Sequence, residues 1–597
     1  MTIYVAPVRD MLFAMKELAG LDEIATLPGN EDVSTELVEA ILDEAGKYAS
    51  GVLAPINAQG DQQGCKCKDG VVTTADGFKE AYASFCANGW NAMPASPDYG
   101  GQGLPALVSS GVVEMWKSSN LSFSLCQMLT LGAVEAIVHH ASDELKQRFL
   151  PKMVEGLWTG TMNLTEPQAG SDLSAVRSKA VPDGDAYRIS GTKIFITWGE
   201  HDMAENIVHL VLARLPDAPE GVKGISLFIA PKFLVNDDGS VGARNDLVCA
   251  SIEHKMGIHA SPTAVMAFGE KDGAIGYLVG QPNQGLAYMF TMMNHARLNV
   301  GLEGVAISER AYQQALAYAR ERVQGRPLGD PSAEPKPIIH HPDVRRMLMD
   351  MKARIEAMRA LAYYTAGNMD RARRHPEASV RRRSQSFVDL LTPVVKGWCT
   401  ESALGITSTG IQVHGGVGFI EESGACQHMR DARITTIYEG TTGIQANDLI
   451  GRKLARDKGV AMKALIEEMA NDEASLAASG DNDLVALAVC LKRGIAALAG
   501  ATEWMLANYD AQPRSAAAGA VPFLKLTGTV VGGWLMTRAA RIAVAKLVAP
   551  DADAGLYHAK RVTARYYAEH VVPEALAYRD AVVNGADAVL FLDVAQF

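Results

Sequence analysis

The segment Ile437-Tyr-Glu-Gly-Thr441 contains a carboxylate that could act as a base. Glu439 is followed directly by Gly440, so its side chain is expected at a bend of the backbone, where side chains leave the wall of a helix. The apolar and aromatic side chains expected behind it are Ile434, Ile437 and Tyr438. Such surroundings disfavour the charged form and raise the pKa of a carboxyl group toward that of a working base. An ordinary glutamate at a helix end is the alternative on local sequence alone.

A second segment carries polar groups suited to holding a ligand. Residues 162–173 read Met-Asn-Leu-Thr-Glu-Pro-Gln-Ala-Gly-Ser-Asp-Leu, with hydroxyls, a glycine and backbone N–H groups. These groups suit the polar edge of a flat cofactor ring and its phosphates, and a β-turn decorated with polar residues is the alternative. Residues 193–199 read Lys-Ile-Phe-Ile-Thr-Trp-Gly, and residues 294–297 read Asn-His-Ala-Arg.

Two glycine-bearing turns and one basic cluster follow. Residues 321–326 read Glu-Arg-Val-Gln-Gly-Arg, and residues 412–419 read Gln-Val-His-Gly-Gly-Val-Gly-Phe, which is expected to be a loop. The basic cluster Arg371–Arg383 is interrupted by His375-Pro376. That interruption favours a solvated corner between two helices over an anion site.

These segments, in this order, resemble the acyl-CoA dehydrogenase family. The family's catalytic base lies in a Tyr-Glu-Gly-Thr segment, and its signature Thr-Glu-Pro-x-Ala-Gly-Ser-Asp matches residues 165–172. The loop Pro97-Asp-Tyr-Gly-Gly-Gln-Gly-Leu-Pro105 also looks like the loop that follows the family's early helices. The resemblance covers about three quarters of the chain. Residues 4–18, residues 254–262 and the C-terminal tail look most like the 3-methylmercaptopropionyl-CoA dehydrogenase group.

The resemblance implies an oxidoreductase of fatty acid β-oxidation that uses FAD and converts an acyl-CoA thioester into a trans-2-enoyl-CoA. Glu439 would remove the α-proton while the β-hydride passes to the flavin, and an electron-transfer flavoprotein would accept the electrons. The implied substrate is a medium- or long-chain fatty acyl-CoA or a 3-methylmercaptopropionyl-CoA-like thioester. An acyl-CoA oxidase, which uses O₂, and a DNA-associated flavoprotein with a basic extra C-terminal domain are the alternatives. The C-terminal tail of this chain has no excess of basic residues.

The resemblance also assigns roles to single residues. The FAD contacts fall on Leu164, Thr165, Gly170, Ser171, Phe195, Thr197, Arg322, Gln324, Gln412, Gly415, Gly416 and Thr441. The substrate contacts fall on Ser171, Arg297 and Gly440, with Arg297 reaching the CoA part. Glu166 and Asp172 are expected to be structural. One subgroup of the family takes its base from the residue before this arginine, but Ala296 stands there, which leaves Glu439.

Two departures from the family pattern leave questions open. The family usually has Trp and then Asn at the positions of Phe195 and Trp198, so either ring could cover the flavin. The family's Gln or Glu two positions beyond Thr441 is replaced by Gly443, so the FAD contact made there is either absent or supplied by Gln445.

Composition and charge narrow the class of protein. The chain has 597 residues, 48% hydrophobic and 21% charged, with a formal net charge of −12. This balance argues against a nucleic-acid surface, which needs clustered Lys and Arg. The eight Cys are scattered, with Cys65 and Cys67 too close for a disulfide framework, and most are expected to be small buried residues in a reducing cytoplasm. We find neither the layout of a signal peptide nor an apolar run long enough to cross a membrane, and expect no metal site.

The elements that must position these residues follow from hydrophobic spacing. We expect a mainly α protein with a central β domain. Its predicted domains are an N-terminal helical domain (1–160), a middle β domain (161–284), a helical bundle with Glu439 (285–455) and an extra C-terminal helical domain (456–597). The expected strands are 187–197, 206–215, 224–230, 263–268 and 276–279. The expected helices include one near 11–18, one starting after Ser34, one over 144–150 that Pro151 halts, and 286–322, 343–374, 383–409, 458–478, 483–509, 520–548 and 553–582.

The cross-subunit FAD contacts lead to an expectation about assembly. Arg322 and Gln324 resemble residues that hold the FAD of a neighbouring subunit, and residues 412–416 resemble the loop that takes its adenosine end. We therefore expect a homodimer in which the C-terminal tail buries the face that other family members use to form tetramers.

Overall fold

The computed structural model describes residues 4–331, 334–550 and 552–597. The chain divides into two compact units. Unit 1 comprises Met1–Gly46, Pro105–Ser118 and Arg297–Phe597, and unit 2 comprises Lys47–Leu104 and Ser119–Ala296. The expected fold class, mainly α with a central sheet, is confirmed. The bounds of the four predicted domains stay predictions.

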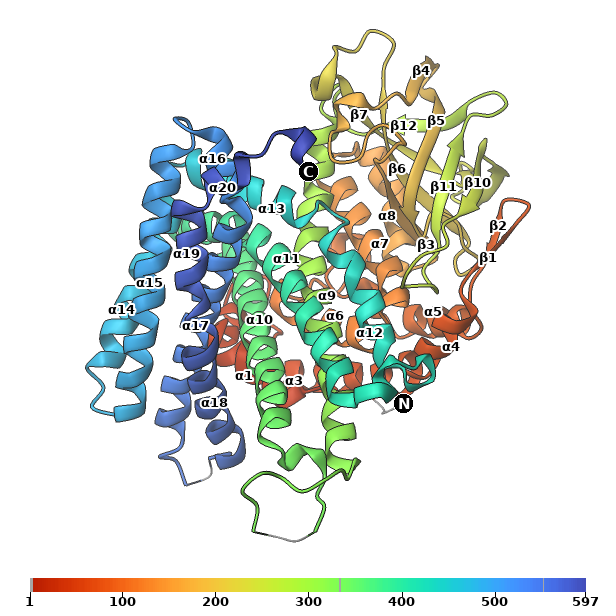
Figure 1. Ribbon diagram of the computed structural model, residues 1–597. Helices are drawn as coiled ribbons and strands as arrows, with labels where there is room; N and C mark the ends of the chain where they lie inside the picture. Colours follow the sequence, from red (N-terminus) through yellow and green to blue (C-terminus); the bar gives the residue numbers. More distant parts are fainter. Residues whose placement is uncertain (1–3, 332–333, 551) are drawn as a thin grey trace. The chain divides into compact units, whose positions relative to one another are not determined.

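Unit 2 is built around one sheet with the strand order β10-β11-β5-β12-β7-β6-β3, and β4 pairs with β5 and β6 (Figure 1). Neighbouring strands are antiparallel except for the parallel pairs β3–β6 and β4–β6. The strands are β3 (Trp158–Asn163), β4 (Lys179–Asp183), β5 (Ala186–Thr197), β6 (Asn206–Arg214), β7 (Ile225–Pro231), β10 (Leu247–Ile252), β11 (Thr263–Phe268) and β12 (Ala274–Leu278). All five predicted strands are present. β6 and β7 are buried along almost their whole length, as their continuous apolar runs require.

Helices and two small hairpins complete unit 2. The helices are α4 (Pro55–Gln63), α5 (Phe78–Ala87), α7 (Leu121–His140) and α8 (Asp143–Glu155). The hairpins, which sequence analysis missed, are β1 (Lys66–Lys68) with β2 (Val71–Thr73) and β8 (Phe233–Val235) with β9 (Val241–Arg244). Helix α7 packs against β3 and α8, so it supports the sheet edge at which the polar segment 162–173 begins.

The helices of unit 1 hold the candidate base. They include α1 (Val8–Phe13) with the π-helical turn Ala14–Leu18, α2 (Leu21–Ala25), α3 (Thr35–Tyr48), α6 (Ala106–Ser119), α9 (Gly285–Glu321), α10 (Pro342–Arg374), α11 (Ala378–His414), α12 (Ala425–Ala432) and α13 (Thr442–Asp448). The last two residues of α3, the last residue of α6 and Gly285–Ala296 of α9 belong to unit 2. The Ser34 hydroxyl accepts a hydrogen bond from the backbone N–H of Leu37 at 3.1 Å, which is the expected start of α3. Helix α10 packs along α11, and α12 and α13 also pack against α11.

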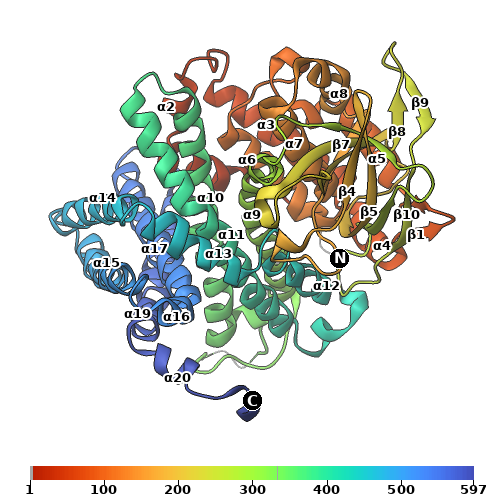
Figure 2. The ribbon, with the colours of Figure 1, turned by 90° about the horizontal axis from the view of Figure 1, so that it is seen from above.

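The C-terminal tail adds a helical layer to unit 1. Its helices are α14 (Val460–Ala477), α15 (Asn482–Asn508), α16 (Pro513–Ala518), α17 (Ala520–Lys546), α18 (Ala554–Tyr566), α19 (Glu574–Asn584) and α20 (Ala586–Leu590), and Figure 2 shows α14 and α15 almost end on. Helix α17 is central, because it packs against α15, α18 and α19 and also against α10 and α11. The apolar stripes of the tail are therefore buried on the helical bundle, as expected.

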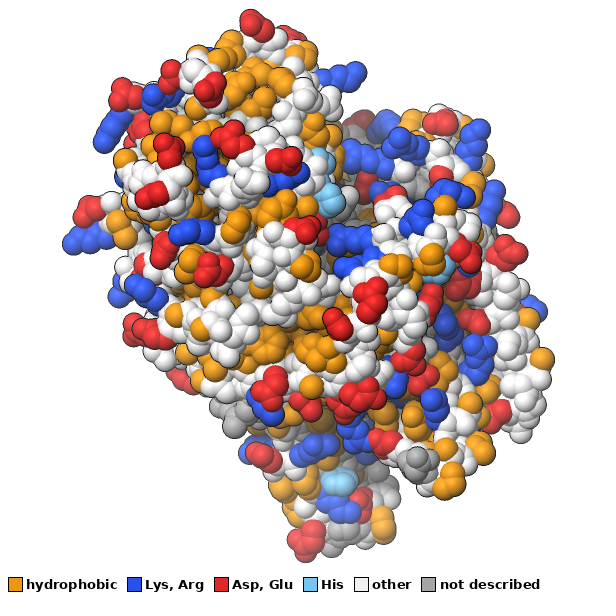
Figure 3. All heavy atoms as spheres, turned by 180° about the vertical axis from the view of Figure 1, so that it is seen from behind, with side chains coloured by type: hydrophobic (Ala, Val, Ile, Leu, Met, Phe, Trp, Pro, Cys, Tyr) orange, Lys and Arg blue, Asp and Glu red, His pale blue; other side chains and the backbone are white. Residues whose placement is uncertain are grey.

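A buried ion cluster ties the tail to the rest of unit 1. The Arg359 guanidinium binds Glu114 at 2.7 Å, Glu309 at 2.8 Å and Asp10 at 2.7 Å. Lys560 of α18 also pairs with Asp10. Because a buried charge without a partner is costly, removing one member leaves the others destabilised. Elsewhere, Figure 3 shows Lys and Arg side chains interspersed with Asp and Glu over one face.

Several sequence predictions about single elements are wrong. Helix α8 continues through Pro151 to Glu155 and is capped by Gly156, which has a φ of +89°. The apolar face that α8 buries outweighs the roughly 3 kcal/mol that an internal proline costs. Helix α11 starts earlier and ends later than 383–409, since it begins at Ala378 and continues to His414. The expected 412–419 loop is instead helical, with a 3₁₀ turn over Gly415–Phe419 after the end of α11. The predicted helix 553–582 is broken near Pro573 into α18 and α19.

Three predictions about residue environments also need correction. Of the eight Cys, three are buried and five are only partly buried, and the Sγ atoms of Cys67 and Cys249 are 4.0 Å apart. Two arginines of the basic cluster are not simply solvated, since Arg371 pairs with Glu23 at 2.7 Å and Arg374 donates to Gly29 O at 2.5 Å. Finally, α7 and α15 are long and apolar enough by composition to cross a membrane, with 89% and 50% of their apolar windows buried.

Candidate active site

Glu439 lies on a tight bend between two helical segments of unit 1. Helix α12 is followed by the 3₁₀ turn Arg433–Thr436, and α13 starts at Thr442, so the predicted helix end, loop and helix start are all present. Glu439 has a φ of +54° and Gly440 a φ of +87°. A glutamate in the left-handed region is strained by roughly 1–3 kcal/mol and persists only when its surroundings hold it there.

Two side chains hold this bend by its carbonyl oxygens. The Gln445 side-chain amide donates to the backbone carbonyl of Glu439 at 3.0 Å. The Lys396 ammonium group of α11 donates to the carbonyl of Gly440 at 2.7 Å. Both side chains are fully buried. Thr441, expected to contact FAD, caps α13 by accepting a hydrogen bond from the backbone N–H of Ile444 at 3.2 Å.

The surroundings of Glu439 suit a base that works near neutral pH. Burial raises the pKa of its carboxyl group, the nearby charges of Arg297 and Lys396 lower it, and Glu303 raises it, with the net result a pKa of about 7. At that value the group is partly unprotonated at pH 7 and still basic enough to accept a proton. Ile437, expected behind the carboxylate, is 46% exposed, so it does not supply this burial.

Arg297, the first residue of the last segment of unit 1, is buried beside the same carboxylate. Its side chain is only 6% exposed, and its guanidinium lies 3.5 Å from the carboxylate of Asp448. Burial lowers the pKa of Arg297, and the charges of Asp448 and Glu439 oppose that change. A contact between Arg297 and the CoA part of a substrate stays a prediction.

A buried chain of polar side chains lies behind the bend. The Tyr438 hydroxyl donates to the carboxylate of Glu303 on α9. The other oxygen of Glu303 accepts from the Lys117 ammonium group at 3.1 Å, and both of these side chains are fully buried. Burial lowers the pKa of Lys117, and Glu303 opposes that change. Sequence analysis did not identify Glu303, Lys117 or Lys396.

Unit 2 presents the other predicted site residues along β5. The backbone N–H of Ile194 donates to the carbonyl of Thr165 at 2.9 Å, and the Lys193 ammonium group donates to the carbonyl of Leu164 at 3.1 Å. Lys193 also pairs with Glu166 at 2.8 Å, and the carboxylate of Glu166 accepts from the hydroxyl of Ser178 at 2.6 Å. The strand therefore fixes the backbone of Leu164 and Thr165 next to Lys193–Thr197.

Phe195 and Trp198 have opposite environments on β5 and just after it. Trp198 is fully buried, and its indole N–H donates to the carbonyl of Ser122 at 3.2 Å. Phe195 is 59% exposed and has a φ of +60°, which is strained for an aromatic residue. Phe195 is thus the ring that β5 presents on its surface.

The polar groups around Phe195 fit the polar edge of a flavin. Within the described ranges, no residue forms a side-chain hydrogen bond with the hydroxyls of Thr165, Ser171 or Thr197. A side chain at Gly170 would meet no atom within 4 Å, so the backbone there is open to a ligand. Asp172, expected to be structural, accepts a hydrogen bond from Ser174 N at 2.9 Å. An exposed ring, available hydroxyls and open backbone are what an FAD site requires.

The remaining predicted cofactor residues gather at one end of unit 1. Arg322 and Gln324 follow the end of α9 and are exposed, and Arg322 donates to Gln324 at 3.3 Å. Gln412, Gly415 and Gly416 lie at the end of α11, and all three are exposed. The rings of Tyr318 on α9 and His414 on α11 stack at 4.6 Å, which brings the two helix ends together.

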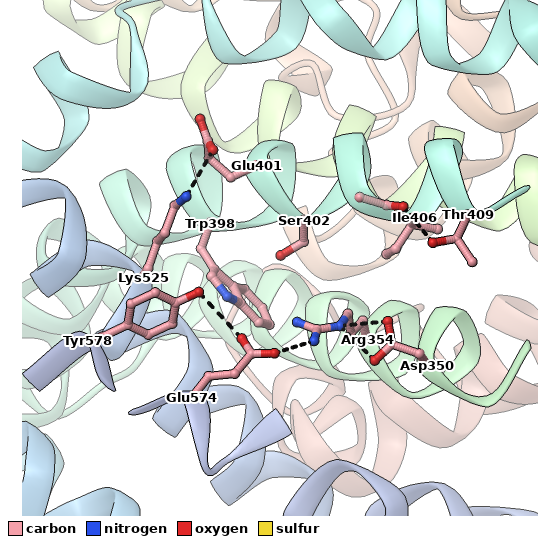
Figure 4. A pocket seen from close by; sticks show the side chains of 11 residues that line it. Asp350, Arg354, Trp398, Glu401, Ser402, Ile406, Thr409, Lys525, Glu574 and Tyr578 are labelled. Atoms are coloured by element: carbon pink, nitrogen blue, oxygen red, sulfur yellow. Dashed lines mark hydrogen bonds and ion pairs between the residues drawn. The ribbon is translucent and has the colours of Figure 1, made fainter. Parts of the chain in front are cut away.

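A separate cavity of about 240 Å³ lies among α10, α11, α17 and α19 (Figure 4). Its charged lining is paired within itself, with Arg354 bound to Asp350 at 3.0 Å and Lys525 to Glu401 at 3.2 Å. Glu401 also accepts from the Thr442 hydroxyl at 2.7 Å, just after the bend at Glu439. Glu439 does not line this cavity.

Comparison with known proteins decides the family. The acyl-CoA dehydrogenase N-terminal, middle and C-terminal domains match residues 35–157, 161–270 and 283–454, and the acetyl-CoA dehydrogenase C-terminal-like family matches residues 462–593. The 3-methylmercaptopropionyl-CoA dehydrogenase of Ruegeria pomeroyi is 48% identical over 98% of this chain and 99% of the relative. The chain belongs to the acyl-CoA dehydrogenase family.

Two further acyl-CoA dehydrogenases are similar along nearly the whole chain. A butyryl-CoA dehydrogenase of Syntrophomonas wolfei is 37% identical over 96% of this chain and 95% of its own. The solved structure of an acyl-CoA dehydrogenase of Bacillus anthracis in complex with FAD matches with a TM-score of 0.75 at 20% identity, over 94% of this chain and 90% of that chain. As a member of this family, the present chain is an oxidoreductase with FAD as its cofactor, as the sequence predicted.

Proposed function

We propose that this acyl-CoA dehydrogenase oxidises 3-methylmercaptopropionyl-CoA or a straight-chain acyl-CoA of similar length, with Glu439 as the base. The observation that carries the assignment of the base is the bend itself, where a strained glutamate with a pKa of about 7 is held by two buried side chains. The substrate class is supported by the similarity to relatives named for 3-methylmercaptopropionyl-CoA and butyryl-CoA.

In the proposed mechanism the carboxylate of Glu439 accepts the α-proton of the thioester. FAD, when bound, would supply the acceptor for the hydride of the β-carbon. The residues proposed to hold it are the Thr165, Ser171 and Thr197 hydroxyls, the ring of Phe195 and the backbone at Leu164 and Gly170. Charge develops on the thioester oxygen as the proton leaves, so a donor aimed at that oxygen lowers the barrier.

The backbone N–H of Glu439 is the donor that unit 1 offers to the thioester oxygen. No described residue accepts a hydrogen bond from this N–H. One such donor is worth roughly 3 kcal/mol of transition-state stabilisation. A substrate whose carbonyl oxygen binds this N–H would bring its α-carbon close to the side chain of the same residue. Gly440, which follows, adds no side chain to obstruct it.

The assembly we propose is a cytoplasmic homodimer that completes each FAD site across its interface. Arg297 and Arg322 are 25 positions apart in or just beyond α9, which corresponds to about 37 Å at 1.5 Å per residue. The Arg322 end therefore serves a different site from the one beside Glu439. The exposed apolar residues at that end, Val323, Val417, Phe419 and Ile420, are suited to an interface.

A graded substrate panel with a dye acceptor tests the proposed substrate. The panel runs from C4 to C16 acyl-CoAs and pairs 3-methylmercaptopropionyl-CoA with pentanoyl-CoA, in which a methylene replaces the sulfur. We expect the highest kcat/KM for the short members and for the thioether. A maximum at medium or long chains would contradict the proposal and favour the other substrate class that the sequence allows.

The electron acceptor is tested separately. We propose an electron-transfer flavoprotein as the physiological acceptor. Turnover without any added acceptor should therefore be slow and should yield little hydrogen peroxide, and addition of an electron-transfer flavoprotein should restore it. Stoichiometric peroxide at full rate in air would identify an oxidase instead.

A further inference from the structure

The carbonyl oxygens of Glu439 and Gly440 are held by two buried donors. Lys396 holds the Gly440 carbonyl at 2.7 Å, and Gln445 lies 3.0 Å from the Glu439 carbonyl and 3.3 Å from that of Gly440. Lys396 lies in the middle of α11 and Gln445 in α13, so the bend is tied to two helices. These ties offset the strain of the left-handed backbone at Glu439.

Burial of an ammonium group that is hydrogen-bonded only to a carbonyl oxygen costs folding free energy. Lys396 is fully buried, and the only hydrogen bond of its ammonium group to a described residue goes to a neutral oxygen. A buried cation is ordinarily paired directly with a carboxylate, as Lys117 is with Glu303. Here the nearby carboxylates act through space. Burial lowers the pKa of Lys396 to about 8, and the charges of Glu439 and Glu303 oppose that change.

We propose that Lys396 is a positioning residue for the reaction. It fixes the Glu439 carboxylate by holding the carbonyl of Gly440, and its charge sets the pH at which Glu439 can accept a proton. This inference rests on the proposed role of Glu439 as the base. Lys396 does not need to touch the substrate for either effect.

The charged groups that face Glu439 act in opposite directions. Arg297 on α9 and Lys396 on α11 favour its carboxylate form, and Glu303 on α9 disfavours it. Tyr438 adjoins it and donates to Glu303. Loss of the Lys396 charge should therefore raise the pKa of Glu439, and loss of the Glu303 charge should lower it. A base must be unprotonated, so the acid limb of the pH profile of kcat/KM follows this pKa.

The test compares pH profiles of kcat/KM for four FAD-loaded variants of the full chain. Lys396→Met should move the acid limb upward by roughly one pH unit and lower kcat by about 10²-fold through misplacement of the carboxylate. Lys396→Arg keeps the charge and should return the limb to its wild-type position. Glu303→Gln should move the limb downward. Lys560→Met removes another buried lysine, paired with Asp10, and should lower the melting temperature without moving the limb.

Opposite shifts for Lys396→Met and Glu303→Gln, with rescue by Lys396→Arg, support the inference. An unmoved limb in Lys396→Met, or a shift equal to that of Lys560→Met, overturns it. Lys396→Met could fail to fold or to bind FAD, and the other two variants then decide. An unmoved acid limb in Glu303→Gln overturns the proposed effect of nearby charges on Glu439. A displaced acid limb in Lys396→Arg overturns the role of the Lys396 charge. Should Glu439→Gln remain active, the proposed base itself fails, and that result is independent of the profiles.

Discussion

The side-chain amide of Gln445 donates a hydrogen bond to the backbone carbonyl of Glu439, 3.0 Å away. Gln445 is fully buried, so its amide nitrogen is committed to the bend that carries the candidate base. The sequence alone leaves open whether Gln445 binds FAD in place of a side chain at Gly443. Its position in the structure favours a structural role in the bend instead.

Arg297 gives a prediction with two separable readouts. Arg297→Ala should raise KM for acyl-CoA more than it lowers kcat if the guanidinium contacts the CoA part, because such binding is uniform between ground and transition states. Its charge also lowers the pKa of Glu439, so the acid limb should move to higher pH. Steady-state kinetics across pH measure both effects. A moved limb with an unchanged KM would assign Arg297 to the base alone, and loss of FAD would assign it to the cofactor.

The two aromatic residues of the β5 region should respond differently to substitution. Phe195→Ala should weaken FAD binding and change the flavin absorbance spectrum, because the exposed ring is the one available for stacking, worth about 0.5–1.5 kcal/mol. Trp198→Phe should lower the melting temperature through loss of the bond to Ser122 and leave the spectrum unchanged. Equilibrium dialysis of FAD and thermal unfolding distinguish them. The reverse pattern would place Trp198 on the flavin.

The Glu166–Lys193 pair predicts acid sensitivity. Burial raises the pKa of Glu166, but Lys193 and Ser178 lower it by more. The net result is a pKa of about 2 in place of the ordinary value of 4.5. Because the folded value lies below the unfolded one, the stabilisation is present above pH 4.5 and is lost as pH falls toward 2. The difference corresponds to roughly 3 kcal/mol. Thermal unfolding at pH 7 and pH 3 should show a smaller acid loss in Glu166→Gln than in wild type. Equal losses of stability in the two proteins would contradict the coupling of stability to the protonation of Glu166.

The cross-subunit site predicts that FAD and assembly are coupled. Sedimentation should give a dimer, and dilution to monomer should release FAD. Arg322→Ala should weaken FAD binding while kcat at saturating FAD changes little. Arg493→Ala, which removes another exposed arginine on α15, should leave FAD binding unchanged. A stable monomer that retains FAD would refute the shared site. A tetramer would contradict the proposal that the tail covers the face used for tetramer formation.

The fold was largely predictable because its signals are local and periodic. The strand 206–215 and the helix 286–322 were predicted within one or two residues of β6 and α9, since alternation and helical spacing are visible in the sequence. Pro151 misled because a proline signals a helix end locally, whereas the burial of the α8 face is a tertiary effect.

The candidate site was predictable only where a motif is continuous in sequence. Glu439 and its bend were identified because Tyr, Glu, Gly and Thr are adjacent. Lys396 was missed because it binds a carbonyl 44 positions away, and nothing in its neighbourhood on α11 marks that contact. Glu303 and Lys117 were missed for the same reason, since they are 186 positions apart and meet only in the folded chain.

The most direct test of the account is anaerobic reduction of the flavin by substrate in Glu439→Gln. The amide keeps the size of the side chain but cannot accept the α-proton, and a general base contributes roughly 10²–10⁴-fold. We expect the variant to be folded and yellow, to bind acyl-CoA, and to reduce its flavin at least about 10²-fold more slowly than wild type. Retention of more than about a tenth of the wild-type rate would contradict the assignment of Glu439 as the base.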